Sequence, residues 1–303
     1  MNYSYDNNSK GISYTAGFFM LIAFAVAGLI LASIISIPIW QSMTGMELKE
    51  MEKQMNNPAY ADVFKIMQLL TAVFGFFVPA VVTAALMNRR PFKLLGLAEG
   101  ASPQQAGVVI LIIGASLAVA TGLTYVNAHI PVPENWRVEF MKLEDNYNRQ
   151  VEAIIQLKNT KDYIIALVVM AFLPALCEET MFRGGLQNFL TRSTNMPWLS
   201  IIIVSLIFSV VHLSFYGFLS RMFLGIILGF IFQYSGKLWL SILAHFINNA
   251  LALTVLYFYI RQGKTLQDAM QSDAASFWGL LAIPVVIAFF ELFRRVSGKR
   301  HTA

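Results

Sequence analysis

The chain carries few side chains suited to acid–base or metal chemistry, and four of them fall within one long apolar region. From Tyr163 to Ile260 the only acidic residues are Glu178 and Glu179, and the only histidines are His212 and His245. A carboxylate and imidazoles can hold and deprotonate a water molecule, while imidazole and amide N–H groups can stabilise an oxyanion. These groups are the ones that amide hydrolysis requires.

Spacing along a helix divides the two glutamates between different tasks. Glu179 and Arg183 are four residues apart, so they share a helix face and can form an ion pair. Glu178 points about 100° away and is free to face a cavity. Pro174 lacks the N–H that would bond to the carbonyl of Met170, which predicts a kink or an opened turn just before the glutamates.

The two histidines belong to similar four-residue pairs. His245 shares a helix face with Asn249, and His212 shares one with Phe208. Glu178 and His212 both lie 17 residues from the turn at residue 195, so they are expected at the same depth. His245 lies only nine residues after the turn at residue 236, so that turn must sit deeper in the bundle.

The same residues leave the role of a metal open. Zinc accepts two histidines and a glutamate with one position left for water, although the His-Glu-x-x-His signature is absent. A metal-bound water and a glutamate-activated water remain alternatives, with Zn²⁺ as the possible cofactor. Cys177 has acidic neighbours, which disfavour a thiolate, so we expect a small buried hydrophobe there.

The composition shows which kind of scaffold must hold these residues. Of 303 residues, 57% are hydrophobic and 13% are charged, and the mean hydropathy is +0.60. Soluble domains carry about 25% charged residues, so this is an integral membrane protein. An ionisable group at a bilayer centre costs about 2.5–3.5 kcal/mol, and groups retained there are functional candidates. The net charge of +5 suits anionic lipid and needs no nucleic acid partner.

Apolar runs predict an all-α bundle of about eight transmembrane helices in a single polytopic domain, residues 1–303. The catalytic core covers about 163–259, and a periodic mixed-charge stretch predicts an amphipathic loop helix at about 134–158, on the membrane face or over the bundle. Gly225 and Gly229 indicate close helix packing within the bundle. The expected spans are Tyr14 to Trp40, Ile66 to Met87, Ala106 to Val126, Tyr163 to Leu190, Trp198 to Phe215, Phe218 to Tyr234, Leu238 to Tyr259 and Phe277 to Phe293.

Basic clusters at the span ends suggest an orientation. Arg89, Arg90 and Lys93 follow the second span, and Arg294 and Arg295 end the last one, with few acids nearby. Because cytoplasmic loops carry an excess of Lys and Arg, we expect both termini in the cytoplasm.

Three motifs on three spans together resemble those of the CPBP family of intramembrane proteases, also called the CAAX protease and bacteriocin-processing or Abi family. This family includes the type II CAAX prenyl endopeptidases. The motifs cover about Tyr163 to Tyr259, and each is complete. They are Glu178-Glu179-Thr180-Met181-Phe182-Arg183, Phe208-x-x-x-His212 and His245-x-x-x-Asn249.

The resemblance implies an eight-helix bundle with a cavity open toward the cytoplasm, in a bacterial plasma membrane. It implies peptide-bond hydrolysis without a covalent intermediate, on a membrane-associated or lipidated peptide or protein. Glu178 would be the general base, with His212 helping to hold the water. The oxyanion site would be His245 and Asn249, with Glu179, Arg183 and Phe208 as structural support. The family is often labelled metalloprotease, although its structural interpretation favours glutamate chemistry, so metal stays open.

Two other kinds of function compete with proteolysis. Carboxylates and histidines inside a bilayer also form proton relays, which would suit a proton- or ion-coupled transporter. No matched pair of broken spans suggests the inverted repeat common in transporters. A non-enzymatic membrane protein of the bacteriocin-immunity kind would not need the glutamates at all.

Overall fold

The structure of the chain, a computed structural model, describes residues 7–55, 57–264 and 275–298. Across these ranges the regular secondary structure is helical and contains no named strand, which confirms the all-α prediction. Among the described residues, seven helical stretches are long and apolar enough to cross a membrane. They are Tyr14–Thr44, Pro58–Met87, Pro103–Ala128, Thr160–Thr194, Phe218–Ser235, Leu238–Arg261 and Phe277–Ser297.

Four of these stretches are single helices, and each of the other three combines several helical segments. The single helices are α1 (Tyr14–Thr44), α5 (Pro103–Ala128), α11 (Phe218–Ser235) and α12 (Leu238–Arg261). The second stretch joins the 3-10 turn η3 (Pro58–Tyr60), α2 (Ala61–Ala72), the π-helical η4 (Val73–Phe77) and α3 (Val78–Met87). The fourth joins α7 (Thr160–Ala166), η5 (Leu167–Phe172), α8 (Leu173–Glu179), η6 (Thr180–Gln187) and α9 (Asn188–Thr194), and the last joins η7 (Phe277–Ala282) to α14 (Ile283–Ser297).

Helix ends follow ordinary capping chemistry. Ser102 and Gln105 form a capping box at the start of α5. Gly45 and Gly236 adopt left-handed conformations (φ 71° and 66°) at the ends of α1 and α11, and Asn195 (φ 57°) ends α9 in the same way. These residues therefore set where the chain reverses.

The fifth predicted span is shorter than expected. The prediction that it continues to Phe215 is wrong, because α10 (Pro197–Val210) ends at Val210 after 14 residues. At 1.5 Å per residue it measures about 21 Å, less than the roughly 30 Å apolar core of a bilayer. The loop that follows α10 is bound to α5. The buried Asn127 side chain of α5 donates to the Phe215 carbonyl (2.8 Å) and accepts from the Leu219 N–H (3.0 Å).

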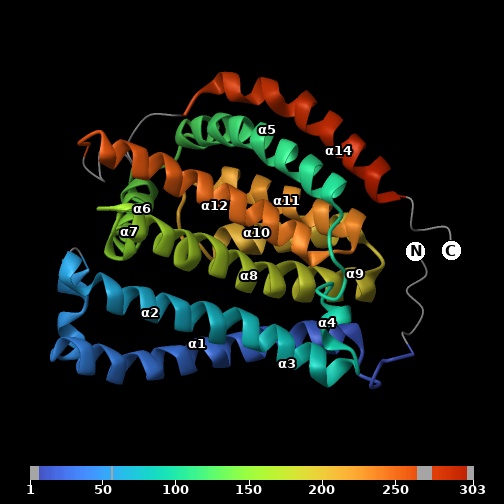
Figure 1. Cartoon of the computed structure of the whole chain (residues 1–303), viewed down its shortest axis with the longest axis horizontal. Helices are drawn as coiled ribbons and strands as arrows, with labels where there is room; N and C mark the ends of the chain where they lie inside the picture. Colours follow the sequence, from blue (N-terminus) through green and yellow to red (C-terminus); the bar gives the residue numbers. More distant parts are fainter. Residues whose placement is uncertain (1–6, 56, 265–274, 299–303) are drawn as a thin grey trace.

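The helices form three layers, which Figure 1 shows edge on. The middle layer contains α8, α10, α11 and α12, with α1, α2 and α3 on one side and α5 and α14 on the other. Two large apolar clusters fill the boundaries between them. One joins residues of α1 and α3 to η6 and α10, and the other joins α5 and α14 to α11 and α12. The middle layer is thus the one that is buried on both faces.

Glycines allow the middle layer to pack tightly, as the sequence predicted for Gly225 and Gly229. A Cβ on Gly225 would lie 2.9 Å from the Cβ of Ser205 in α10. A Cβ on Gly229 would lie 2.8 Å from Gln187 Oε1 and 2.9 Å from Ile201 Cγ2. Both glycines of α11 therefore serve packing between helices of the bundle.

A helix, α6 (Glu134–Ile154), lies in the stretch where the amphipathic loop helix is expected at about 134–158, and it ends four residues earlier. It lies across one end of the bundle (Figure 1). This is the end at which α5 and α12 finish and α7 and α14 begin, opposite to the start of α1 and the end of α14.

Candidate active site

The middle layer brings the predicted site residues together from three stretches of chain. Glu178 and Glu179 belong to α8, and Arg183 follows in η6. Phe208 is in α10, with His212 just beyond its end, and His245 and Asn249 are in α12. Since Glu179 lies 16 residues from Asn195 and His245 only nine from Gly236, their contact requires the second turn to sit deeper, as expected.

Glu179 is the centre of a buried ionic network. Its Oε1 atom accepts from Arg183 Nη1 at 2.7 Å, which is the ion pair predicted from the spacing, and from His245 Nδ1 at 2.8 Å. The exposed fractions of these three side chains are 0%, 1% and 5%. Sequence reasoning missed the bond to His245, because nothing in the spacing relates α8 to α12. Glu179 therefore orients a histidine as well as holding the arginine.

Arg183 is held by two further contacts. Its Nη2 donates to the Gly225 carbonyl at 3.2 Å, and its guanidinium carbon lies 4.6 Å from the centre of the Phe208 ring. The contact with Gly225 ties η6 to α11, while the ring contact is a cation–π interaction with α10. A single buried cation thus links three helices of the middle layer.

Phe208 packs between the groups that would do chemistry. Its ring centre is 4.9 Å from that of His212 and 5.8 Å from that of His245, with near-perpendicular or inclined rings. The residue is 1% exposed. The Phe208 ring thus contacts both histidines of the predicted site.

The hydrogen bonds of both histidines decide which ring nitrogen is left for chemistry. His212 Nδ1 lies 2.7 Å from the Phe208 carbonyl oxygen, and His245 Nδ1 lies 2.8 Å from the Glu179 carboxylate. Carbonyl and carboxylate oxygens only accept, so each Nδ1 carries the hydrogen. Nε2 is therefore the atom that each imidazole offers to a water or a substrate.

Glu178 has a carboxylate oxygen without a hydrogen-bond partner near the Nε2 atom of His245. Its Oε2 is buried without a hydrogen-bond partner among the described atoms, and it lies 3.9 Å from His245 Nε2. The side chain keeps 17% of its surface exposed, whereas Glu179 keeps none. A gap of 3.9 Å is too long for a direct hydrogen bond but suits groups that share a water molecule. The two neighbouring glutamates thus have the different environments that the spacing predicted.

Asn249 lies one helical turn beyond His245. Its Oδ1 accepts from Asn248 Nδ2 at 3.2 Å, which leaves its own N–H groups as donors. The structure places it on the same helix as His245, but its described contact is with its neighbour and not with the glutamates.

The helix that carries the glutamates is opened on both sides of them. The π-helical turn η5 ends two residues before Pro174, where the missing N–H predicted an opened turn. A second π-helical segment, η6, follows immediately and contains Arg183. This second segment was not predicted, although the Gly184-Gly185 pair within it is the kind of signal that marks helix irregularity. π-Helical turns often occur at functional sites.

Gly184 and Gly185 also let other segments approach the site helix. A Cβ on Gly185 would lie 2.4 Å from Leu21 Cδ2 of α1, and one on Gly184 would lie 3.0 Å from the Leu95 carbonyl oxygen. Leu95 follows the short helix α4 (Pro91–Leu94). The flanking layer is thereby locked against η6.

Contacts with α6 hold the loop that follows His212, and sequence reasoning did not identify them. Phe140 stacks on Phe215 with ring centres 4.1 Å apart, and Glu144 Oε2 accepts from Ser214 Oγ at 2.7 Å. Arg221 lies over the Tyr147 ring at 4.6 Å. The periodic placing of Phe140 and Tyr147 was visible as an amphipathic pattern, but their partners were not.

Metal ligation was tested against the same geometry. In the described ranges, no group of three or more His, Cys, Asp or Glu side chains lies close enough to hold a metal ion. Glu178 and His245 face each other, yet a third ligand does not join them in this arrangement. The described side chains, as they stand, do not form a zinc site.

Comparison with known proteins agrees with the motifs. Residues 160–251 match the family described as type II CAAX prenyl endopeptidase Rce1-like. The chain has no significant match among curated proteins or solved structures. The matched segment, 92 of the 303 residues, contains every residue of the predicted site, and together with the motifs it supports a CAAX protease family assignment.

Proposed function

We propose that the chain is an intramembrane endopeptidase that hydrolyses a peptide bond of a membrane-associated or lipidated peptide by water activated at Glu178. The observation that carries the proposal is the unpartnered Oε2 of Glu178, 3.9 Å from the Nε2 atom of His245. A carboxylate oxygen with no protein donor, next to an imidazole nitrogen, is suited to hold a water between them.

The hydrolytic step follows from these positions. Glu178 removes a proton from the water, whose oxygen attacks the carbonyl carbon of the substrate. Collapse of the tetrahedral intermediate breaks the C–N bond, and the proton held by Glu178 passes to the leaving nitrogen. His212 helps to hold the water through Nε2, since its Nδ1 is engaged by the Phe208 carbonyl.

Oxyanion stabilisation falls to His245 and Asn249. Because Nδ1 of His245 donates to Glu179, the ring can donate to an oxyanion only when Nε2 is also protonated. The Glu179 carboxylate then compensates for the imidazolium charge. Asn249 supplies amide N–H donors from the next turn of α12. Arg183 keeps Glu179 in place and has no contact with the reacting atoms in this scheme.

We propose that the substrate enters from the bundle end that α6 covers. The helix α10 is short and His212 follows its end, so the water-holding groups lie nearer to α6 than to the basic end of the bundle. The resemblance implies an entrance that faces the cytoplasm. The basic clusters predict that the termini face the cytoplasm, and the start of α1 and the end of α14 lie at the end of the bundle opposite to α6 (Figure 1). With this entrance, only one of the two expectations can hold. Labelling single cysteines at Glu152 and at Glu99 with a membrane-impermeant maleimide in intact cells decides between them.

The central experiment compares Glu178→Gln with the parent chain. Full-length protein is reconstituted in liposomes with a quenched fluorescent peptide that carries a farnesylated C-terminal Cys-aliphatic-aliphatic-X sequence. Loss of a general base lowers rates by about 100- to 10,000-fold. We expect a loss in this range with an unchanged melting temperature, and no change for Glu139→Gln on the exposed face of α6.

Other outcomes would assign the site differently. Normal cleavage by Glu178→Gln would remove the proposed role of this residue. Substrate-dependent pH changes in the liposome lumen without peptide cleavage would indicate a transporter. Elemental analysis of the active preparation, with a chelator titration, distinguishes glutamate-activated water from a zinc-dependent reaction, because the proposal expects full activity in protein that contains no zinc.

A further inference from the structure

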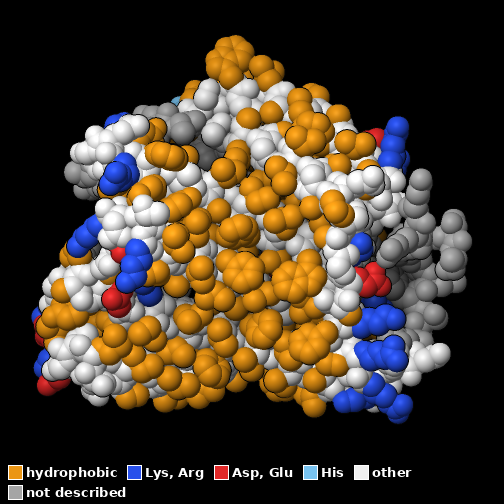
Figure 2. Space-filling model, viewed as in Figure 1, with side chains coloured by type: hydrophobic (Ala, Val, Ile, Leu, Met, Phe, Trp, Pro, Cys, Tyr) orange, Lys and Arg blue, Asp and Glu red, His pale blue; other side chains and the backbone are white. Residues whose placement is uncertain are grey.

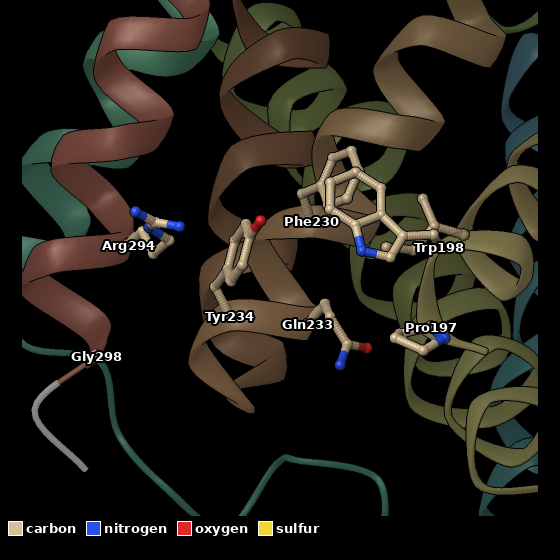
Figure 3. A pocket seen from close by; sticks show the side chains of 8 residues that line it. Pro197, Trp198, Phe230, Gln233, Tyr234, Arg294 and Gly298 are labelled. Atoms are coloured by element: carbon tan, nitrogen blue, oxygen red, sulfur yellow. The ribbon is translucent and has the colours of Figure 1, made fainter. Parts of the chain in front are cut away.

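A cavity lies at the end of the middle layer away from α6 and takes no part in the proposed reaction. It has a volume of about 270 Å³ and is formed between α10, α11 and α14 (Figure 3). It lies where α10 begins and where α11 and α14 end, remote from Glu178. Its lining residues are Pro197, Trp198, Ile201, Phe230, Gln233, Tyr234, Arg294 and Gly298.

One wall of this cavity is a row of aromatic rings. The ring centres of Trp198 and Phe230 are 4.6 Å apart, and those of Phe230 and Tyr234 are 6.0 Å apart and nearly parallel. Trp198 keeps 62% of its surface exposed. Trp and Tyr gather where a bilayer's apolar core meets its headgroups. The row therefore suits a hydrocarbon chain that enters from the membrane.

The opposite wall carries a cation. Arg294 stands across the cavity from Trp198 and beside Tyr234 (Figure 3). One guanidinium nitrogen donates to Glu291 at about 3.1 Å, and the side chain is 60% exposed. A guanidinium has five N–H donors, so donors remain for a phosphate group, which it can bind in a bidentate manner.

A buried lysine adds positive charge behind the cavity. Lys237 is 6% exposed, and its Nζ donates to the neutral Gln105 amide at 2.9 Å. The same amide donates to Ser297 Oγ at 3.1 Å, and Ser297 precedes the lining residue Gly298. A buried ammonium ion whose described hydrogen bond goes to a neutral group favours a nearby anion.

The same end of the molecule carries further basic side chains. Lys and Arg side chains gather at this end of the molecule, next to the wide apolar belt of the helices (Figure 2). Basic pockets between transmembrane helices at a headgroup level are typical sites for anionic lipids. Cavity, aromatic wall and charge therefore point to one kind of ligand.

We propose that this cavity binds one anionic glycerophospholipid from the adjoining leaflet. The phosphate is bound by Arg294 and the Tyr234 hydroxyl, and an acyl chain lies along Trp198 and Phe230. A zwitterionic lipid has the same phosphate, but its ammonium group would lie near Arg294 and Lys237. The site thus selects net negative charge. The inference is independent of the proposed proteolysis.

The test uses native mass spectrometry of the full-length protein in detergent, titrated with phosphatidylglycerol or phosphatidylcholine of identical acyl chains. Phosphatidylglycerol is expected to bind more tightly. A basic residue near a charged lipid contributes about 1 kcal/mol, so Arg294→Gln should weaken phosphatidylglycerol binding about fivefold. Arg295→Gln is the matched control, because Arg295 also pairs with Glu291 but does not line the cavity. Its binding should match that of the parent chain.

A third variant and three competitors sharpen the result. Glu291→Gln should tighten binding, since it frees Arg294 from its partner. Glycerol 3-phosphate, diacylglycerol and farnesylcysteine should each fail to displace the lipid. Equal binding of the two lipids, equal losses in both arginine variants, or displacement by any one competitor would overturn the proposal. Displacement by farnesylcysteine would make the cavity a prenyl site, and displacement by glycerol 3-phosphate a phosphate site.

Discussion

The middle layer and the flanking layers are built from similar apolar helices but differ in what they bury. Buried charged or histidine side chains in the described ranges all lie between residues 160 and 261, namely Glu179, Arg183, Lys237 and His245. The flanking helices bury only neutral polar groups, such as Ser36, Thr83 and Ser116. Only a layer covered on both faces can supply internal partners for ions, so the buried layer is also the one that holds the candidate chemistry.

The largest effect on stability is expected from breaking the ionic network of the middle layer. Glu179→Gln removes the charge that Arg183 and His245 share at 2.7 and 2.8 Å. Breaking a buried ion pair on one side costs about 3–5 kcal/mol, because the other charge is left unpaired. We expect a loss of this size in the free energy of unfolding in detergent. Arg137→Gln, which breaks an exposed pair with Glu134, should have no measurable effect.

If Glu179→Gln and Arg137→Gln lowered the free energy of unfolding by the same amount, the buried ionic network would not contribute more to stability than an exposed ion pair does. Activity of any folded Glu179→Gln protein adds a second measurement. Since Glu179 positions His245, cleavage by the Glu179→Gln protein should fall. The melting temperature and the activity of Arg137→Gln should remain those of the parent chain.

A smaller loss is expected from adding a methyl group in the middle layer. A Cβ on Gly229 would meet Gln187 and Ile201 at 2.8–2.9 Å, and overpacking of this kind costs about 1–3 kcal/mol. Gly114→Ala in the flanking helix α5 is the counterpart, because no atom lies within 4 Å of its Cβ position. It should be neutral or slightly stabilising through helix propensity. Equal melting temperatures for Gly229→Ala and Gly114→Ala would contradict the difference in packing between these two positions.

Loosening the cover over the middle layer should affect activity more than stability. Phe140→Ala removes the ring that stacks on Phe215 at 4.1 Å and so frees the loop after His212. Aromatic pairs contribute about 0.5–1.5 kcal/mol, which corresponds to a loss of up to about tenfold in kcat/KM. Val138→Ala, at an exposed position of the same helix, is the control. A Phe140→Ala protein with full activity would show that α6 does not position His212.

The smallest effect is expected at Cys177. Cys177 is buried next to Glu178, and we expect it to serve only in packing. Because Cys177→Ala is a small change of volume in a core, cleavage should stay within about twofold of that of the parent. Loss of cleavage with an unchanged melting temperature would indicate that Cys177 acts as a nucleophile. The peptide assay and a thermal scan on the same preparation make the distinction.

Relations within one helix were predictable, whereas the specific side-chain contacts between helices were not. The Glu179–Arg183 ion pair, the opened turn before Pro174 and the amphipathic pattern of α6 follow from residues close in sequence. The bond from Glu179 to His245 joins residues 66 apart, and the Phe140–Phe215 stack joins residues 75 apart. The end of α10 at Val210 was also missed, because it depends on Asn127 of α5 holding the loop.

By itself, the sequence determined that the chain is a helical membrane protein and which few ionisable residues it keeps among apolar ones. Both follow from the cost of polar groups in a bilayer and from the 3.6-residue helical repeat. Only the tertiary structure decided that Glu179 holds both Arg183 and His245, that each histidine presents Nε2, and that α6 covers the loop after His212. Helix depth and rotation depend on packing against neighbours, and that information is spread over the whole chain rather than contained in any one segment.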